Sequence, residues 1–475
     1  MENLFFFLSL LSSLFFLSSS FTPPDNHLIT CGSTLPATTP NNRVFLPDSK
    51  SDLFLLSSHR KISIQDPNPP PNSNPLYESA RIFTKPSSYS FPIKSTGPHI
   101  VRLHFAPFSS DNYNLSSSFF HVSALQFSLL RNFSVPENTH VVKEYIINTG
   151  SEKKLVISFD PACKSSFAFV NAIEVISASD DLIADVARLV DPEGIKDYDG
   201  LLGSALETIH RINVGGPKVT PFNDTLWRNW IPDEKFLLLK DSSKAISFSG
   251  RIKYQPGGAT RLIAPDSIYN TARVLNVENA KIAEPNFNIT WEFPVNLGYK
   301  YLVRMHFCDI VSPVLNQLYF DVYLNGFSAY EDIDLSHITN MLASPHYVDF
   351  VVEPEISGVI RVTVGPSSLN PSDINAILNG LEIMKLNNSI GSLDGEFEVV
   401  SVKSWMSKNV GVFLCSVLGG IAFMCILIAA FMLVSRRWTT LRDSVAWSPL
   451  PPDVSEGSTR YRNMLSTGKL GYVKV

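Results

Sequence analysis

The feature that most constrains the fold of this 475-residue chain is an internal repeat that spans most of its length. Six short segments recur in the same order, at offsets that climb from 184 to 208 residues. The paired segments begin at Leu28 and Ile212, Leu46 and Ile231, Tyr77 and Tyr269, Val101 and Val303, Leu155 and Ile360, and Asn171 and Asn379. Ordered matches with a growing offset indicate two copies of one unit, the second with longer loops. We therefore predict two tandem domains, at residues 24–178 and 205–386, joined by a connector at 179–204.

Each copy has the sequence pattern of many short β-strands. His99–Phe105 and Ile360–Val364 alternate polar and apolar residues, which predicts half-buried strands, and clusters of Pro, Gly, Asn and Ser separate such runs. Helical periodicity is scarce, and Asp181–Val190 in the connector is its best example. The repeated Gly32 and Gly216 fit tight turns. The fold class predicted is mostly β, with two jelly-roll β-sandwich domains.

Two apolar runs predict that most of the chain faces the cell exterior. Leu4–Phe21 has the length of a signal-peptide core, so residues 1–20 are expected to be a signal peptide. Val410–Val434 carries no charge, and as a helix it would extend about 37 Å, enough to cross a hydrocarbon core of about 30 Å. The basic pair Arg436 and Arg437 follows it, as the positive-inside rule requires. We predict a single-pass type I membrane protein with a stalk at 387–409, a transmembrane helix at 410–434 and a cytoplasmic tail at 435–475.

Sequons and cysteines agree with a secreted ectodomain. Five Asn-X-Ser/Thr sequons predict N-glycosylation at Asn114, Asn132, Asn223, Asn288 and Asn387. Three cysteines lie outside the apolar run, and in an oxidising compartment we expect one disulfide among Cys31, Cys163 and Cys308, with the pairing left open. No cysteine spacing resembles a zinc site, and no metal or cofactor is expected.

The charge distribution bears on the partners. The chain has a net charge of −5, while the segment after residue 434 holds seven basic and three acidic residues, so the exterior is the more acidic part. An acidic exterior argues against nucleic acid and is compatible with a basic peptide; solubility alone is the alternative explanation.

Catalysis in the exterior is not expected. The repeated His104 and His306 each precede a Phe on a strand, with no nucleophile motif nearby, and we interpret both as structural. The 44 acidic residues include no pair that a motif marks as glycosidase carboxylates. Trp227 and Trp230 are expected to pack the core of the second domain, with contact to a peptide as the alternative.

Several longer motifs resemble a known family. These are Cys31-Gly-Ser, Leu103-His-Phe-Ala-Pro-Phe108, Ser166 to Val175, Arg211-Ile-Asn-Val-Gly-Gly-Pro217, His306 to Ser312 and Ala376 to Met384. They resemble the tandem malectin-like ectodomain of the plant receptor-like kinases that include FERONIA and THESEUS, from about Pro24 to Lys385. The resemblance implies two malectin-like domains on a plasma-membrane receptor. It also implies a secreted cysteine-rich peptide ligand, a glycolipid-anchored co-receptor, and pectin or other wall glycans as a second class of ligand.

The chain departs from this family after the membrane span. The 41 residues of the tail contain no Gly-rich nucleotide loop, His-Arg-Asp or Asp-Phe-Gly motif. We therefore expect this chain not to be an enzyme, and to sense peptides or wall components as a co-receptor or decoy beside full-length receptor kinases. The alternatives are a truncated form of a receptor Ser/Thr kinase and a wall-polysaccharide adhesion protein.

Overall fold

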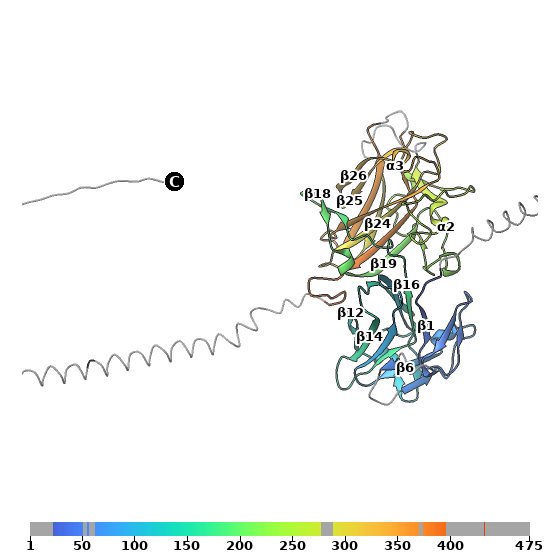
Figure 1. The fold of residues 1–475 in the computed structure, drawn as a ribbon, viewed down its shortest axis with the longest axis vertical. Coiled ribbons are helices and arrows are strands. Elements are labelled where there is room, and N and C mark those ends of the chain that lie inside the picture. Colours follow the sequence, from blue (N-terminus) through green and yellow to red (C-terminus); the bar gives the residue numbers. More distant parts are fainter. Residues whose placement is uncertain are drawn as a thin grey trace, which may run out of the picture. The chain divides into compact units, whose positions relative to one another are not determined.

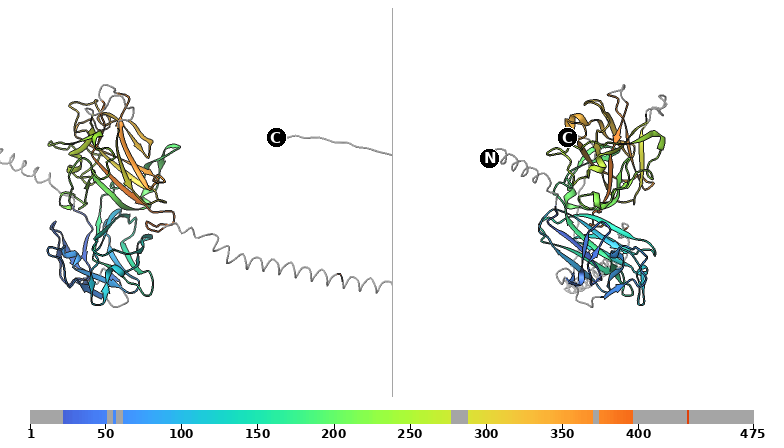
Figure 2. Two further views of the ribbon diagram at one scale, coloured as in Figure 1. Left: turned by 180° about the vertical axis from the view of Figure 1, so that it is seen from behind. Right: turned by 90° about the vertical axis from the view of Figure 1, so that its right-hand side faces the viewer.

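The computed structural model describes residues 22–50, 55–56, 62–276, 288–369, 374–395 and the single residue Met432. These residues form a mostly β fold (Figures 1 and 2), as the alternating pattern predicted. Two short α-helices are described, α2 (Asp266–Tyr269) and α3 (Leu335–Thr339).

The predicted membrane topology falls outside this part of the chain. The signal peptide at 1–20 and the tail at 435–475 are not among the described residues, and the span at 410–434 contributes only Met432. Within the described residues, no helix is both long and apolar enough to cross a membrane.

One 13-stranded sheet runs through both copies of the repeat. The second copy and the connector supply β18 (Gly194–Tyr198), β17 (Ala187–Asp191), β27 (Pro345–Val352), β24 (Tyr301–Cys308), β30 (Gly380–Leu386) and β19 (Ala205–Asn213), in this order. The first copy continues with β13 (Val141–Asn148), β8 (Pro98–Phe105), β16 (Ala172–Ser177), β1 (Asn26–Thr30), β3 (Val44–Pro47) and β2 (Ala37–Thr38). The short β20 (Ile231–Pro232) pairs with β19.

Smaller sheets form the second layer in each half. In the first half they are β12 (Phe127–Phe133), β11 (Phe120–Ala124), β14 (Lys154–Pro161), β7 (Ser87–Pro92) and β4 (Leu55–Leu56); β15 (Ala168–Val170), β6 (Ser79–Phe83) and β5 (Ile62–Gln65); and β10 (Tyr113–Asn114) with β9 (Ser109–Ser110). In the second half they are β23 (Ile289–Pro294), β28 (Val359–Pro366), β25 (Tyr319–Leu324) and β26 (Phe327–Asp334); and β21 (Ser243–Ser247), β22 (Thr271–Leu275) and β29 (Ile377–Leu378). Each half is thus a sandwich of two β layers.

Two separate hydrophobic clusters fill these sandwiches. In the first, Val101 and Leu103 from the large sheet pack with residues such as Phe120 and Ile157 from the opposite layer. In the second, Met305 occupies the same kind of position, among residues from β23, β25 and β28. Burial of these apolar side chains is the main force that holds each sandwich together.

Equivalent contacts in the two halves reproduce the sequence repeat. Asp48 Oδ2 accepts a hydrogen bond from the Arg81 Nε atom at 2.8 Å. At the equivalent place, the Asp233 carboxylate accepts from Arg273 Nε at 2.5 Å. A buried aromatic donor completes each site, Tyr89 in the first half and Trp291 in the second.

The structure corrects one detail of the repeat by a single residue. The sequence paired Gly32 with Gly216, but the structural equivalent of Gly32 is Gly215. Both residues have positive φ, +80° and +69°, and in each a Cβ would lie 2.2 Å from a backbone carbonyl oxygen, that of Ala80 or Ala272. Only glycine allows this conformation together with this close approach.

The connector also differs from its prediction. Residues 181–190 do not form a helix, because Ala187–Asp191 is the strand β17, which pairs in parallel with β27 through Arg188 and Leu189. Strand β18 follows as the second arm of a hairpin. The exposed edge of β27 forms hydrogen bonds with this segment. These bonds outweigh the weak helical preference that the sequence of the segment suggests.

Strand β8 is more buried than its alternating pattern predicted. All eight residues from Pro98 to Phe105 are buried, including His99, Arg102 and His104. The polar residues are buried because β8 lies inside the large sheet, between β13 and β16, and its polar face packs against other parts of the chain. From Val101 to Phe105 the alternation therefore separates an apolar face, with Val101, Leu103 and Phe105, from a buried face that carries Arg102 and His104.

The start of the predicted stalk packs against the first half. Ser128 N donates to Gly391 O at 2.9 Å, and Leu393 N donates to Ser128 O at 2.8 Å. The Leu393 side chain is fully buried in the first hydrophobic cluster. Residues 387–395 therefore link the end of β30 in the second half to β12 in the first, and we call them the C-terminal strap.

Candidate functional site: the junction and its bordering surfaces

The two halves meet where β13 of the first pairs with β19 of the second. Only three residue pairs join these strands, at Tyr145, Ile146 and Ile147 of β13. The equivalent strand of the second half is β27, whose corresponding edge pairs with β17. The same strand edge therefore has a different partner in each half. In the first half, the edge of β13 pairs with β19 and forms the junction; in the second half, the edge of β27 pairs with the connector hairpin.

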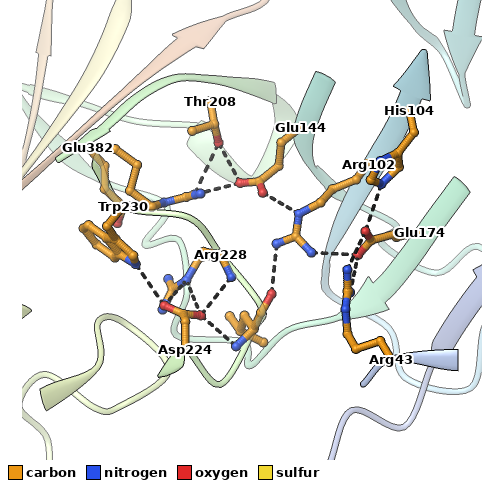
Figure 3. Close-up of polar contacts among 12 residues, drawn as sticks. Arg43, Arg102, His104, Glu144, Glu174, Thr208, Asp224, Arg228, Trp230 and Glu382 are labelled. Atoms are coloured by element: carbon orange, nitrogen blue, oxygen red, sulfur yellow. Dashed lines mark hydrogen bonds and ion pairs between the residues drawn. The ribbon is translucent and has the colours of Figure 1, made fainter. Parts of the chain in front are cut away.

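Beyond these pairs, alternating charges continue across the junction (Figure 3). In the first half, the Glu174 carboxylate accepts from Arg43 at 2.6 Å and from Arg102 at 2.9 Å. Arg102 Nε also donates to Glu144 Oε2 at 2.6 Å. Glu144 Oε1 lies 2.8 Å from Arg211 of β19, in the second half. Glu144 on β13 therefore joins a guanidinium group of each half.

The second half completes this array. Arg211 Nε donates to Glu382 Oε2 at 2.6 Å, and the Thr208 hydroxyl donates to Glu144 Oε1 at 3.0 Å. A second bridge lies nearby, where Glu207 accepts from Lys143 of the first half at 2.7 Å and from Lys385 at 2.5 Å. Buried charges of this kind are tolerated because each one has an opposite partner and several hydrogen bonds.

The arginines hold the buried glutamates ionised. Burial alone would raise the pKa of Glu144, but Arg211 and Arg102 outweigh burial and lower its pKa to about 2. Burial would also raise the pKa of Glu174. Arg102, His104 and Arg43 outweigh burial and hold this pKa well below its ordinary range. A carboxylate with so low a pKa is not suited to general acid catalysis near neutral pH.

A loop of the second half also reaches into the first. Leu226 O accepts from Arg102 at 2.9 Å, so residues 224–230 contact the charged array directly. Asp224 fixes the loop by accepting from Arg228 Nε at 2.9 Å and from Trp230 Nε1 at 2.9 Å. As predicted, Trp230 is buried in the second half. Trp227 differs, since it packs with first-half residues and faces the Arg43 guanidinium.

The repeated histidines occupy matching structural positions. His104 Nε2 lies 2.9 Å from Glu174, and Tyr77 is its other polar neighbour. His306 Nε2 lies 3.3 Å from Glu382, and its Nδ1 lies 3.1 Å from the Tyr269 hydroxyl. All partners are buried or half-buried side chains of the fold, which agrees with a structural role. Among the described residues, no group of three or more His, Cys, Asp or Glu is placed to hold a metal ion.

The three thiols outside the apolar run are not joined. Cys31 and Cys308 are buried in different hydrophobic clusters, and Cys163 is exposed. The bridge expected among these three residues is therefore not formed in this structure: the two buried thiols lie in separate cores, and Cys163 lies at the surface. Burial raises the pKa of the Cys31 thiol well above its ordinary value.

The sequons differ in exposure. Asn114, Asn132 and Asn223 are exposed, whereas Asn288 and Asn387 are half-buried. Asn387 lines a cavity of 640 Å³ beside Tyr198, Tyr299 and Lys300. Glycosylation at these five residues remains a prediction.

Sequence reasoning missed most members of the junction. Arg102, Glu174 and Glu382 lay within the repeated segments, and charged residues at matched positions of apolar strands were the available signal. Glu144 and Arg211 carried no such signal as a pair, because their contact depends on how the two halves meet.

Comparisons with known proteins agree with this architecture. The malectin-like domain family matches residues 29–386. Relatives from Arabidopsis thaliana include the probable receptor-like protein kinase At5g24010, 44% identical over 94% of this chain, THESEUS 1, 41% identical over 83%, and FERONIA, 34% identical over 83%. The match covers 53%, 45% and 46% of these proteins, so the chain spans about half the length of the relatives.

Solved structures give the same result. The ANXUR1 extracellular domain from Arabidopsis thaliana is 30% identical, with a TM-score of 0.69 over 78% of this chain and 99% of its own. The structure of the plant peptide RALF23 in complex with FER and LLG2 contains a chain that is 30% identical, with a TM-score of 0.66 over 79% of this chain and 99% of its own. The chain therefore belongs to the malectin-like domain family, and its predicted resemblance to the FERONIA and THESEUS receptor-like kinases is confirmed.

Proposed function

We propose that the described region is the ligand-recognising ectodomain of a single-pass plasma-membrane receptor. Its ligand is a secreted, basic, cysteine-rich peptide, bound together with a glycolipid-anchored co-receptor. The observation that carries this proposal is the likeness, along almost the whole ectodomain, to a FER chain solved with the peptide RALF23 and LLG2.

The surface best suited to a basic peptide is the outer side of β25 and β26. This acidic face consists of Tyr319, Asp321, Tyr323, Glu331, Asp332 and Asp334, all partly or fully exposed. Tyrosine rings supply contact area at low conformational cost, and carboxylates attract cationic ligands and speed their association. A polyanion such as pectin would meet like charge here, which favours a peptide over a wall polysaccharide at this site.

The corresponding surface of the first half is chemically different. On β11, His121 and Ser123 occupy the positions of Asp321 and Tyr323, and Asn132 of β12 occupies that of Asp332. Asn132 and Asp332 share a left-handed backbone conformation, with φ of 48° and 54°. Asn132 belongs to a sequon, whereas Asp332 cannot carry an N-linked glycan. A glycan on Asn132 would cover the first-half surface and leave the acidic face open.

A cavity at the border of the acidic face could receive an anchoring side chain. It has a volume of 460 Å³ and lies between the β17–β18 hairpin and strands β26 and β27. Tyr330 and Tyr347 line it together with Asp197, and the Arg188 guanidinium lies 4.1 Å from the centre of the Tyr330 ring. Buried anchors in such pockets supply most of the energy of many interfaces.

A titration of the full chain with RALF23 tests this proposal. The double variant Asp321→Asn and Glu331→Gln is expected to weaken binding about tenfold, at roughly 0.7 kcal/mol for each charge removed, and to flatten its dependence on salt. The control Glu152→Gln, which removes an exposed charge from the first half, is expected to bind normally. Unchanged binding in the double variant would refute the location, and failure of the unmodified chain to bind with LLG2 present would refute the peptide function for this probe.

The route of signalling is part of the same proposal. We propose that the ectodomain, when it is expressed without a kinase domain, modulates the signalling of full-length receptor kinases, either as a co-receptor or as a decoy. Expressed beside a kinase-bearing relative, a decoy would blunt the response to the peptide and a co-receptor would strengthen it. An unchanged response would count against both.

A further inference from the structure

The cavity beside Asn387 lies at the point where the second half ends and the C-terminal strap begins. Its 640 Å³ lies within the range of roughly 300–1,000 Å³ that is usual for small-ligand sites. Its walls come from four segments, the end of β18, Ser204 just before β19, the turn before β24 and the turn after β27, and the start of the strap completes them. One or two sugar rings would fit in a space of this size.

The chemistry of the cavity suits an amphipathic ring. Tyr198 and Tyr299 supply aromatic surface, and each faces an ammonium group, that of Lys300 at 5.7 Å or of Lys385 at 5.0 Å. Glu353 and Lys300, paired at 3.4 Å, add an acceptor and donors at one side. Sugar rings combine an apolar C–H face with hydroxyl groups, and aromatic rings beside polar groups match this combination.

The cavity also leaves an apolar side chain open to solvent. Leu297 lines it and keeps 55% of its surface exposed. A ligand that covers this side chain removes apolar surface from water, which favours its binding.

The asparagine of a sequon is itself a wall of this cavity. Asn387 belongs to Asn387-Asn388-Ser389, and its side-chain amide is held on both sides. Its Oδ1 accepts from Ala205 N at 2.7 Å, and its Nδ2 donates to Asn388 O at 2.9 Å. Since Nδ2 has two hydrogens, one can keep this bond while the other is replaced by a sugar. A sugar attached there begins at the cavity wall.

We propose that Asn387 carries an N-linked glycan whose first N-acetylglucosamine residues occupy this cavity and cover Leu297. In forming the link, Asn387 Nδ2 bonds to C1 of the sugar and loses one proton, while the C1–oxygen bond to the lipid pyrophosphate donor breaks. Because the sugar is tethered at the wall, its effective concentration in the cavity is high, and weak contacts suffice to hold it. The glycan thereby fastens the strap to the second half.

The test compares variants that lose single glycans from the full chain, expressed in a glycosylating host. Ser389→Ala abolishes the Asn387 sequon and keeps both hydrogen bonds of the Asn387 amide. Thr225→Ala is the matched control, because it abolishes the sequon of Asn223, which is exposed and does not line this cavity. Glycopeptide mass spectrometry gives the occupancy of each site, and amide hydrogen exchange reports protection at residues 296–300.

The expected result is an occupied Asn387, with protection at 296–300 lost in Ser389→Ala and unchanged in Thr225→Ala. Excess N,N′-diacetylchitobiose should restore part of that protection in Ser389→Ala. An endoglycosidase should also release the Asn387 glycan from the folded chain more slowly than the Asn223 glycan. The proposal is overturned if Asn387 is unmodified, or if it is modified and exchange at 296–300 is the same with and without its glycan.

Discussion

Glu144 joins the two halves of the ectodomain, and replacing it with glutamine should weaken their junction. Its carboxylate contacts Arg102 of its own half at 2.6 Å and Arg211 of the other at 2.8 Å. Glutamine keeps the size and one acceptor oxygen but removes the charge. Arg43, Arg102 and Arg211 are then balanced only by Glu174 and Glu382, so one buried positive charge is left without its counterpart.

The size of the effect follows from the titration of the carboxylate. The pKa of Glu144 in the fold is about 2, against an ordinary value of 4.5. At 1.36 kcal/mol per pKa unit, ionised Glu144 stabilises the fold by about 3 kcal/mol relative to its protonated form. This agrees with the roughly 3–5 kcal/mol that is lost when one partner of a buried ion pair is removed.

The pH dependence identifies the charge as the cause. Because folding lowers this pKa, the stabilisation is fully present above about 4.5 and is lost as the pH falls towards 2. The gap in unfolding free energy between the unmodified chain and Glu144→Gln should therefore be constant from pH 7 to 5 and shrink below pH 4.5.

Denaturant unfolding of the full chain in detergent, repeated at several pH values, measures this gap. Glu193→Gln is the matched control, because its carboxylate is 80% exposed and pairs with Lys196 on the surface, where ion pairs contribute little. Equal effects of the two substitutions, or a gap for Glu144→Gln that does not change with pH, would refute the assigned role of Glu144.

Three further outcomes test other parts of the structure. Leu393→Ala should cost roughly 2–5 kcal/mol of local stability and speed hydrogen exchange at 391–395. The control Ile390→Ala should do neither, because that side chain is 74% exposed. Equal exchange in the two variants would contradict the packing of the strap. Gly215→Ala should prevent normal folding. The control Gly257→Ala is also at positive φ but has nothing within 4 Å of the added Cβ, so it should cost about 1–2 kcal/mol in thermal unfolding. Similar melting of the two variants would contradict the close approach at Gly215. Iodoacetamide should label Cys163 in the native ectodomain, because Cys163 is exposed and a hydrogen bond with Ser165 lowers its pKa. The buried thiols of Cys31 and Cys308 should react only after unfolding. A protected Cys163 would contradict its placement.

Local patterns in the sequence predicted much of the architecture. Alternation and turn residues identified the strands, and the ordered repeat anticipated the equivalence of sites such as Asp48 and Asp233. Strands and turns depend on residues that are neighbours in the sequence, and the repeat is a similarity between two segments. Both can therefore be detected in the sequence before the fold is known. The one-residue error at Gly216 arose where two adjacent glycines made both alignments equally good in sequence.

Other features depended on contacts between distant segments. Residues 181–190 of the connector had weak helical periodicity, and the open edge of β27 made part of this segment a strand. The alternation of His99–Phe105 was visible, but the burial of its polar face required the surrounding sheet.

The sequence by itself determined the strand-rich class, the repeat and the family of this protein. Only the tertiary structure decided that Glu144 meets Arg211, that the strap returns to the first half and that Asn387 lines a cavity. The physical reason is that a charge or an amide in the sequence has no defined partner until the chain has folded. Its neighbours are set by segments far away in the sequence: Glu144 meets Arg211, 67 residues further along, and the Asp394 carboxylate accepts from the backbone N–H of Arg131, 263 residues away.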